Sequence, residues 1–403
     1  MGRGLAYQCA RTPGLDCVGI ADIDPGRNAE AARFSSREPV SVHTVAEANR
    51  AIARGKLPLC GDGEILATAD GVDVLIEASS AIAAAARTVL AALAARKHVV
   101  LMNSEVDLAF GPALTAEARA SGVVCTSCDG DQHTVLKRLI DEITLWGFDL
   151  VMAGNLKGFL DRYANPTTIA PEAAKRNLNN TMCTAYTDGT KLSIEMALLA
   201  NGLGLSTSVP GMHGPRADHV REVFDLLDVA ALWHRHGPFV DYLLGAEPGG
   251  GVFAVGHCDH PYQREMMAYY KMGAGPFYLF VRPYHLCHVE AVRCIAEAAL
   301  DGEALLEPRA GRRTDVFAYA KRDLLAGEKL DGIGGYACYG QIDNVPLDAD
   351  HPGLPICLAD DVAVARPVRK DEPVLLGDVE LDPTRPDAAL HRRAVACTDG
   401  ACV

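Results

Sequence analysis

The chain has 403 residues, 49% hydrophobic and 22% charged, as is usual for a globular protein of two or three domains. Its formal charge of −14 disfavours nucleic acid or an anionic membrane surface as the main partner. No apolar run reaches the roughly 18 uninterrupted residues of a membrane span. The N-terminus lacks an apolar signal core, and the thirteen cysteines are scattered, so we expect reduced thiols and a cytoplasmic protein.

Residues 1–150 alternate apolar strand-like runs with Ala-rich helical runs. This alternation predicts an α/β domain with a doubly wound parallel sheet, the Rossmann class, and favours dinucleotide binding over another ligand. The expected strands are 17–22, 72–78, 98–103 and 122–126, and the expected helices 81–96 and 111–121.

Ligands of such sheets bind beyond the carboxyl ends of the strands. The polar residues expected at these ends are Asp22, the Ala78-Ser79-Ser80 turn and Asn103. Asp22 lies 20 residues after Gly2, the distance at which an acidic residue binds the ribose in the G-x-G-x-x-G fingerprint.

The fingerprint itself is incomplete, because Met1-Gly2-Arg3-Gly4 matches only its end. We therefore expect the reading frame to begin roughly 20–40 residues upstream, with an apolar strand that ends in Gly-x-Gly. Asp22 would repel a 2′-phosphate and favours NAD, whereas Arg27 or Arg3 could bind that phosphate. We expect NADP by a modest margin, with NAD possible.

Beyond the Rossmann domain (residues 1–150), the pattern changes twice. Residues 151–311 mix strands, polar loops and helices, including expected helices at 217–233 and 285–300, and read as a catalytic or substrate domain. Residues 312–385 contain only short β runs separated by Gly, Pro and Asp, which predicts a small all-β module. A loose tail is expected at 386–403.

One helix should be buried on all sides. Between possible caps at Thr187 or Asp188 and a stop at Gly202 and Gly204, residues 192–200 are almost entirely apolar. Its first turns nevertheless carry Lys191 and Glu195, four residues apart, and a lysine there faces the positive end of the helix dipole. This arrangement suggests a catalytic site; the alternative is a structural Lys–Glu pair.

Lys191 could donate a proton to a carbonyl oxygen that gains charge during hydride transfer, with Asp188 and Glu195 tuning it or binding substrate. Lys157 could bind an anionic substrate, and surface charge is the alternative. His285 could be a second proton-transfer group, although a structural histidine fits the pattern better. The single Cys125-Thr-Ser-Cys128 lacks the second pair of a zinc site, so no metal is expected.

Four motifs, at residues 130–132, 188–196, 282–286 and 320–332, resemble the SAF-domain "predicted homoserine dehydrogenase" group, which includes 1-deoxy-D-xylulose 5-phosphate reductoisomerase-like enzymes. The motifs read Gly-Asp-Gln, Asp-Gly-Thr-Lys-x-x-x-Glu-Met, Arg-Pro-Tyr-His-Leu and Ala-Lys-Arg-Asp-Leu-x-Ala-Gly-Glu-x-Leu-Asp-Gly. The resemblance implies a Rossmann domain, a catalytic domain and a C-terminal SAF (β-clip) domain. It also implies an NADP(H)-dependent oxidoreductase that forms a homodimer.

The leading hypothesis is a reductase of a small hydroxy-carbonyl compound, with or without a phosphate group, that is reductoisomerase-like or homoserine-dehydrogenase-like. NADPH would deliver hydride across the cleft between the two larger domains, with Lys191 polarising the carbonyl. The alternative is a non-catalytic dinucleotide or sugar-acid sensor that binds its ligand through the SAF domain.

Overall fold

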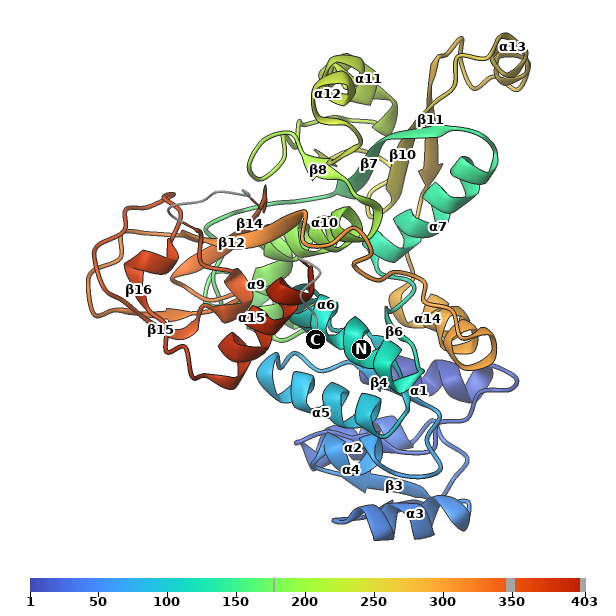
Figure 1. The fold of residues 1–403 in the computed structure, drawn as a ribbon, viewed down its shortest axis with the longest axis vertical. Coiled ribbons are helices and arrows are strands. Elements are labelled where there is room, and N and C mark those ends of the chain that lie inside the picture. Colours follow the sequence, from blue (N-terminus) through green and yellow to red (C-terminus); the bar gives the residue numbers. More distant parts are fainter. Residues whose placement is uncertain (177, 346–351, 399–403) are drawn as a thin grey trace. The chain divides into compact units, whose positions relative to one another are not determined.

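The computed structural model describes residues 1–176, 178–345 and 352–398 (Figure 1). These residues form two compact units, each with its own core. The first unit comprises Met1–Asp131, Leu286–Glu307 and the chain from Leu390, and the second comprises Gln132–His285 and Pro308–Ala389. The expected domain limits at 150, 311 and 385 stay predictions.

The first unit contains two parallel sheets of three strands. One has the order β1-β3-β2 and the other β4-β5-β6, and the alternation of strands with helices confirms the predicted α/β class with a Rossmann-like parallel arrangement. The strands are β1 (Ile20–Ala21), β2 (Pro39–Ser41), β3 (Leu57–Cys60), β4 (Val74–Glu77), β5 (His98–Leu101) and β6 (Cys125–Ser127). The helices are α1 (Gly2–Arg11), α2 (Pro25–Ala32), α3 (Val45–Ala53), α4 (Gly63–Ala67), α5 (Ala83–Ala94), α6 (Ser104–Ser121) and α14 (Cys287–Ala296).

The expected sheet is not continuous in the described residues. β1 and β4 are both edge strands, and no described strand lies between them. The upstream start that was expected to supply such a strand stays a prediction. β1 is also shorter than the predicted strand 17–22, because only Ile20 and Ala21 pair with β3.

The second unit is built on a mixed five-stranded sheet with the order β11-β10-β7-β9-β8. β7 pairs in parallel with β9 and antiparallel with β10. The strands are β7 (Asp149–Lys157), β8 (Ser206–Thr207), β9 (Phe239–Leu244), β10 (Val252–His257) and β11 (Phe277–Arg282). The helices are α7 (Gln132–Leu145), α8 (Ala170–Lys175), α9 (Asn180–Thr187), α10 (Thr190–Leu203), α11 (Val223–Leu226), α12 (Val229–His236) and α13 (Pro261–Tyr269).

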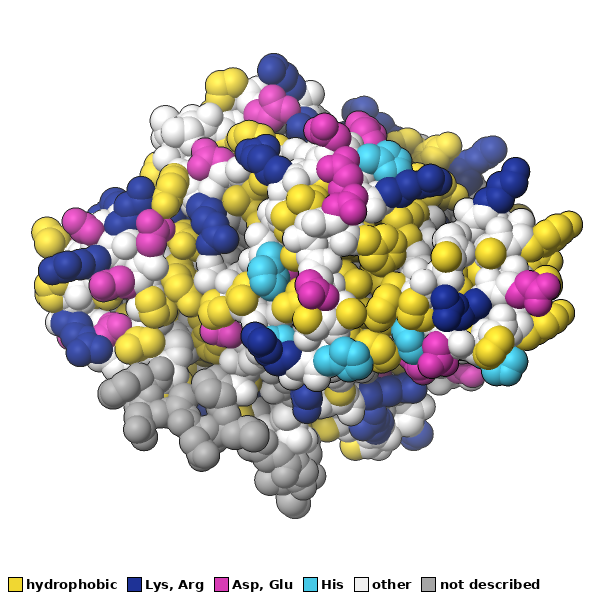
Figure 2. Space-filling model, turned by 90° about the horizontal axis from the view of Figure 1, so that it is seen from above, with side chains coloured by type: hydrophobic (Ala, Val, Ile, Leu, Met, Phe, Trp, Pro, Cys, Tyr) yellow, Lys and Arg dark blue, Asp and Glu magenta, His cyan; other side chains and the backbone are white. Residues whose placement is uncertain are grey.

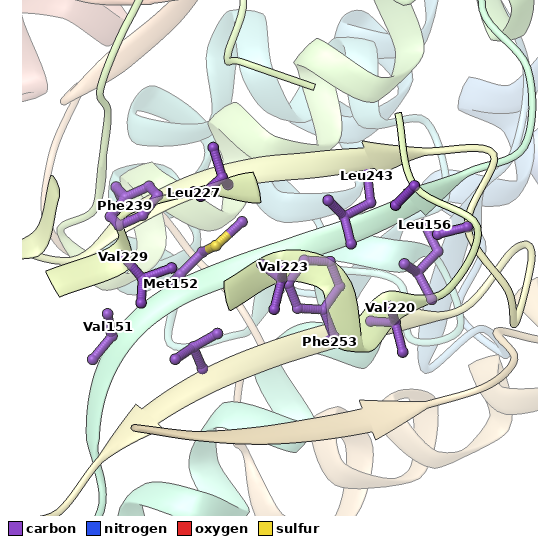
Figure 3. Packing of buried hydrophobic residues seen from close by; sticks show 13 residues of the cluster. Val151, Met152, Leu156, Val220, Val223, Leu227, Val229, Phe239, Leu243 and Phe253 are labelled. Atoms are coloured by element: carbon purple, nitrogen blue, oxygen red, sulfur yellow. The ribbon is translucent and has the colours of Figure 1, made fainter. Parts of the chain in front are cut away.

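A hydrophobic core lies between this sheet and the segment that carries α11 and α12 (Figure 3). Val220 and Val223 belong to the same buried cluster as Phe253, which is completely buried. A Cβ added to Gly154 of β7 would lie 2.1 Å from Cζ of Phe253, so the phenyl ring requires glycine at this position. Because Phe253 is the partner of Gly154 on the neighbouring strand β10, its ring covers the central strand β7 at this position.

The helix predicted at 217–233 is wrong in its start and in its continuity, because helical structure begins only at Val220 and is interrupted at Leu227 and Asp228. α11 ends at Leu226, Leu227 is extended, and Asp228 starts α12 by accepting a hydrogen bond from the Ala231 N–H at 2.9 Å. The aspartate offers the backbone a helix N-cap that competes with a continuous helix.

The C-terminal β strands belong to the second unit. β12 (Thr314–Ala320) pairs antiparallel with β14 (Cys338–Asn344), and β13 (Lys329–Asp331), β15 (Asp360–Val364) and β16 (Val379–Glu380) form a second small sheet. The predicted loose tail is wrong over its described part, because α15 (Pro386–Thr398) occupies it; residues 399–403 lie outside the described residues. Pro386 at the first helical position and Asp387 in the first turn favour this helix.

α10 is the helix that was predicted to be buried, and it is. Every residue from Thr190 to Asn201 is buried, and Gly204, with a left-handed φ of 75°, ends the helix as expected. α10 packs against α7 and β9 of the five-stranded sheet and against β12 and β14 of the C-terminal module (Figure 1).

No helix in the described part of the chain is long and apolar enough to cross a membrane. On the face drawn in Figure 2, acidic and basic side chains are interspersed with hydrophobic ones, and neither charge dominates.

Eleven of the cysteines are free thiols, as expected; Cys397 is disulfide-bonded, which corrects the expectation for that residue.

Candidate active site

The start of α10 carries a buried cluster of charged side chains. Asp188 is 1% exposed, Lys191 5% and Glu195 4%, which is rare for ionisable groups. Asp188 precedes the helix and accepts a hydrogen bond from the Thr190 N–H at 2.9 Å, while Gly189 is the N-cap residue. The N-cap residue is therefore Gly189 and not Asp188, but the Asp188 side chain accepts from the first N–H group of the helix.

Lys157, at the end of β7, reaches the same cluster. Its Nζ donates to the carbonyl oxygen of Tyr186 at 2.5 Å, two residues before Asp188. Burial lowers the pKa of the Lys157 ammonium group, while the nearby carboxylates of Glu195 and Asp188 oppose that shift. The structure therefore places Lys157 electrostatically beside both acidic candidates.

Sequence reasoning missed Lys321 as a member of this cluster. Its Nζ lies 2.9 Å from Oδ2 of Asp188, and both side chains are almost fully buried. Burial raises the pKa of the Asp188 carboxyl, and the Lys321 charge opposes this shift. The available signal was a lysine directly after the apolar strand 314–320, inside one of the motifs that carried the resemblance.

His285 is held by a backbone group of its own unit. Its Nδ1 donates to the carbonyl oxygen of Gly250 at 2.7 Å, and the N–H of Gly250 donates to the carbonyl oxygen of Leu156 at 3.2 Å. This bond orients the imidazole ring and leaves Nε2 for other partners. It agrees with the structural role that the pattern favoured; a part in proton transfer stays a prediction.

The candidate cofactor residues lie in the first unit. α1 begins at Gly2 without an acidic residue in its first turn, and a Cβ at Gly2 would meet no other atom within 4 Å. Leu5 of α1 shares a core with Ile76 and Ala78, so this helix packs against the end of β4. Such an open helix N-terminus suits a phosphate group.

The residues after β1 and β4 also fit a dinucleotide in their chemistry. Ser79 and Ser80 are exposed and can donate hydroxyl hydrogens, and Asp22 ends β1 with its Oδ1 accepting from the Asp24 N–H at 2.9 Å. Arg27 pairs with Asp24 at 3.6 Å and Arg3 with Glu30 at 3.3 Å. Both pairs are exposed and therefore weak, so a phosphate could replace either carboxylate.

Asn103 differs from these residues because its amide is engaged within the protein. Its Oδ1 caps α6 by accepting from the Val106 N–H at 3.2 Å, and its Nδ2 donates to the Ala81 carbonyl at 2.8 Å. Asn103 therefore holds the turn that carries Ser79 and Ser80. Its own contact with a cofactor stays a prediction.

The two cysteines of the C-x-x-C motif are buried, and Cys128 forms a side-chain hydrogen bond with Cys294 of α14. Within residues 1–176, 178–345 and 352–398, no group of three or more His, Cys, Asp or Glu side chains is arranged to hold a metal ion.

Comparisons with known proteins give two domain matches. Residues 27–126 match the model of the homoserine dehydrogenase NAD-binding domain, and residues 130–291 match that of the oxidoreductase DRL catalytic domain. The first runs from α2 into β6 and leaves out β1, and the second contains α10 and Lys157. An NAD(P)-binding domain is thus followed by an oxidoreductase catalytic domain.

Similar solved structures include a 1-deoxy-D-xylulose 5-phosphate reductoisomerase from Zymomonas mobilis in complex with NADPH, with 16% identity over 48% of this chain and 53% of that enzyme and a TM-score of 0.34. A 3-ketoreductase from Actinomadura kijaniata, in complex with NADP, is 15% identical over 71% of this chain and 90% of its own, with a TM-score of 0.31. The chain spans about half the length of the Zymomonas enzyme. Similarity at this level does not identify a shared activity. A search of the curated proteins returns no significant match.

Proposed function

We propose that this chain, an NAD(P)-dependent oxidoreductase by its two domain matches, reduces the carbonyl group of a small hydroxy-carbonyl compound. The substrate is a phosphorylated ketose, as for a deoxyxylulose-phosphate reductoisomerase, or an amino-acid aldehyde, as for homoserine dehydrogenase. The observation that carries the proposal is the cluster that the buried Asp188, Lys191 and Glu195 form with the half-buried Lys157 around the start of α10.

Bound NAD(P)H supplies the hydride, which adds to the carbonyl carbon. The charge that develops on the carbonyl oxygen is stabilised by Lys191, which then provides the proton that completes the alcohol. Lys157 is a second proton donor, because a lysine with a lowered pKa releases its proton more readily. Asp188 and Glu195 tune these ammonium groups or bind the substrate, and His285 is a further proton-transfer group.

The cofactor is NADP in this proposal, with Gly2 and the Ala78-Ser79-Ser80 turn at the pyrophosphate and Arg3 or Arg27 at the 2′-phosphate. The exposed pairs of both arginines with carboxylates support this assignment, whereas Asp22 favours NAD. Comparing kcat/KM with NADPH and NADH decides it, and a tenfold preference for NADH would overturn it.

Residues 312–385 form a SAF-like β-clip module in this proposal, supported by the short strands β12 to β16, and residues 1–150 and 151–311 are the cofactor and catalytic domains. The protein is cytoplasmic and forms a homodimer. Tyr262, Tyr269 and Tyr270 on and beside α13 are 64–74% exposed, as expected of residues that a second copy would cover. Light scattering on the purified protein tests the dimer.

A substrate panel followed at the nicotinamide absorbance tests the function. Lys191→Ala should lower kcat at least about 100-fold with little change in cofactor affinity, and Lys191→Arg should restore little, because arginine does not release its proton. Lys175→Ala, an exposed lysine of α8, is the matched control and should retain activity. Near-normal turnover by Lys191→Ala would disprove the role of Lys191. Cofactor binding without turnover of any aldehyde, ketose phosphate or amino alcohol would favour the sensor alternative.

A further inference from the structure

α10 and β12 run side by side over their full lengths. A 14-residue helix is about 21 Å long and a seven-residue strand about 23 Å, so the two elements match. The start of β12 is fastened to the end of α10: Asn201 Oδ1 accepts from the N–H groups of Arg313 at 2.8 Å and Thr314 at 2.9 Å, and its Nδ2 donates to the Thr314 carbonyl at 3.0 Å.

The other end of β12 is fastened to the start of α10 through Lys321. Its ammonium group contacts Oδ2 of Asp188 at 2.9 Å and donates to the carbonyl oxygens of Ala164 at 2.7 Å and Gly335 at 2.8 Å. The two carbonyl oxygens accept hydrogen bonds from the ammonium group, and the Asp188 carboxylate forms an ion pair with it. Lys321 is therefore fixed in position, and its role differs from that of a proton donor.

The position of Asp188 in turn determines the first turn of α10. Gly189 has no side chain with which to cap the helix, so the Thr190 N–H depends on Oδ1 of Asp188. Thr190 is held from the module as well, because its Oγ1 accepts from the Gly340 N–H of β14 at 2.8 Å. Both contacts lie beside Lys191, the next residue of the helix.

We propose that Lys321 is a positioning residue of the active site, and that the C-terminal β module is the support that holds the catalytic turn of α10. The proposal rests on the proposed function of Lys191. Lys321 fixes the carboxylate of Asp188, Asp188 fixes the Thr190 amide, and the backbone of Lys191 follows. The module thereby sets the geometry of the reaction through the first turn of α10.

Hydrogen exchange of the α10 amides together with steady-state kinetics tests the proposal on the full chain. Lys321→Met keeps the length of the side chain and removes its charge. We expect exchange in the first turn of α10 to accelerate at least tenfold, and kcat to fall at least tenfold while KM changes less than threefold. Lys329→Met, on an exposed lysine of the same module that pairs with Asp361, is the control and should change neither quantity.

The double variant Lys321→Met with Asp188→Asn separates positioning from simple stabilisation. It leaves no unpaired buried charge, and the asparagine oxygen can still accept from the Thr190 N–H. We expect it to regain the hydrogen-exchange protection of the first turn of α10, a measurement that does not depend on the part of Asp188 in the proposed reaction. If the single variant does not fold, the double variant and Lys321→Arg decide. The planar guanidinium group does not fit the site of a lysine ammonium group, so Lys321→Arg should leave the first turn of α10 less protected than the double variant does.

Normal exchange and normal kcat in folded Lys321→Met would overturn the proposal, as would an activity loss with a fully protected first turn. The exchange measurement needs no substrate. Accelerated exchange in a protein that turns over no substrate would therefore refute the proposed function while leaving the support of α10 by Lys321 intact.

Discussion

Asn201→Ala should destabilise the second unit, because the Asn201 side chain forms the hydrogen bonds that join the end of α10 to the start of β12. The substitution removes three hydrogen bonds to the backbone, two from the N–H groups of Arg313 and Thr314 and one to the Thr314 carbonyl. A fourth bond, from Oγ1 of Thr314 at 3.3 Å, is also lost, but this hydroxyl keeps the Ala197 carbonyl as an acceptor. Asn201 is 5% exposed and Thr314 is fully buried, so water replaces these partners poorly. The backbone groups of β12 would remain unpaired.

The magnitude follows from this count. At about 1 kcal/mol for each hydrogen bond, the three losses amount to about 3 kcal/mol. Alanine recovers about 0.5 kcal/mol through its higher helix propensity. The free energy of unfolding should therefore fall by about 2–3 kcal/mol, a large part of the stability of an ordinary domain.

Urea unfolding followed by tryptophan fluorescence measures this loss. The chain has two tryptophans, Trp146 and Trp233, and both lie in the second unit, so the signal reports that unit. Asn180→Ala, at an exposed position of α9, is the control and should change the free energy of unfolding by less than about 0.5 kcal/mol. A loss below about 1 kcal/mol for Asn201→Ala would refute the reasoning, since it would mean that the backbone of β12 needs no partner from α10.

Two further substitutions test the packing of the sheet and a buried acid. Gly154→Ala should lower the free energy of unfolding by about 1–3 kcal/mol, because the added methyl group clashes with Phe253. Phe253→Leu should destabilise the wild type but stabilise the Gly154→Ala variant. If urea unfolding shows that the two losses simply add, the clash is contradicted. Burial raises the pKa of Asp107 from 3.8 to about 6, against the opposing hydrogen bond from Ser127, so the folded state loses stability as the pH rises from about 4 to 6. Asp107→Asn should accordingly raise the free energy of unfolding above pH 6 by up to about 3 kcal/mol and leave it unchanged at pH 4; an equal effect at both pH values would exclude this titration.

Local patterns in the sequence were sufficient for the elements whose residues interact with their near neighbours. The apolar run between Asp188 and Gly204 predicted a helix buried on every side, and α10 is that helix. The alternation of apolar strands with Ala-rich helices predicted the parallel arrangement of the first unit. The candidate residues Asp188, Lys191 and Glu195 were found for the same reason, since charges on an otherwise apolar helix are visible in the sequence alone.

Pairings over long distances were decided only by the tertiary structure. Lys321 and Asp188 are separated by more than 130 residues, and no periodicity connects a lysine after a short β strand with a carboxylate before a helix. The break between α11 and α12 depends on whether Asp228 caps a new helix or lies within one continuous helix. The sequence is compatible with both states, and the two-helix form is the one that buries Val223 and Val229 in the core. The sequence by itself thus determined which segments are helices, strands and buried charges, because those follow from side chains a few positions apart. The packing of β12 and β14 on α10 determined which charged side chains pair and what holds the turn that carries Lys191. These contacts could not be predicted locally, because the free energy of a buried ion pair or a backbone hydrogen bond depends on groups that only the folded chain brings together.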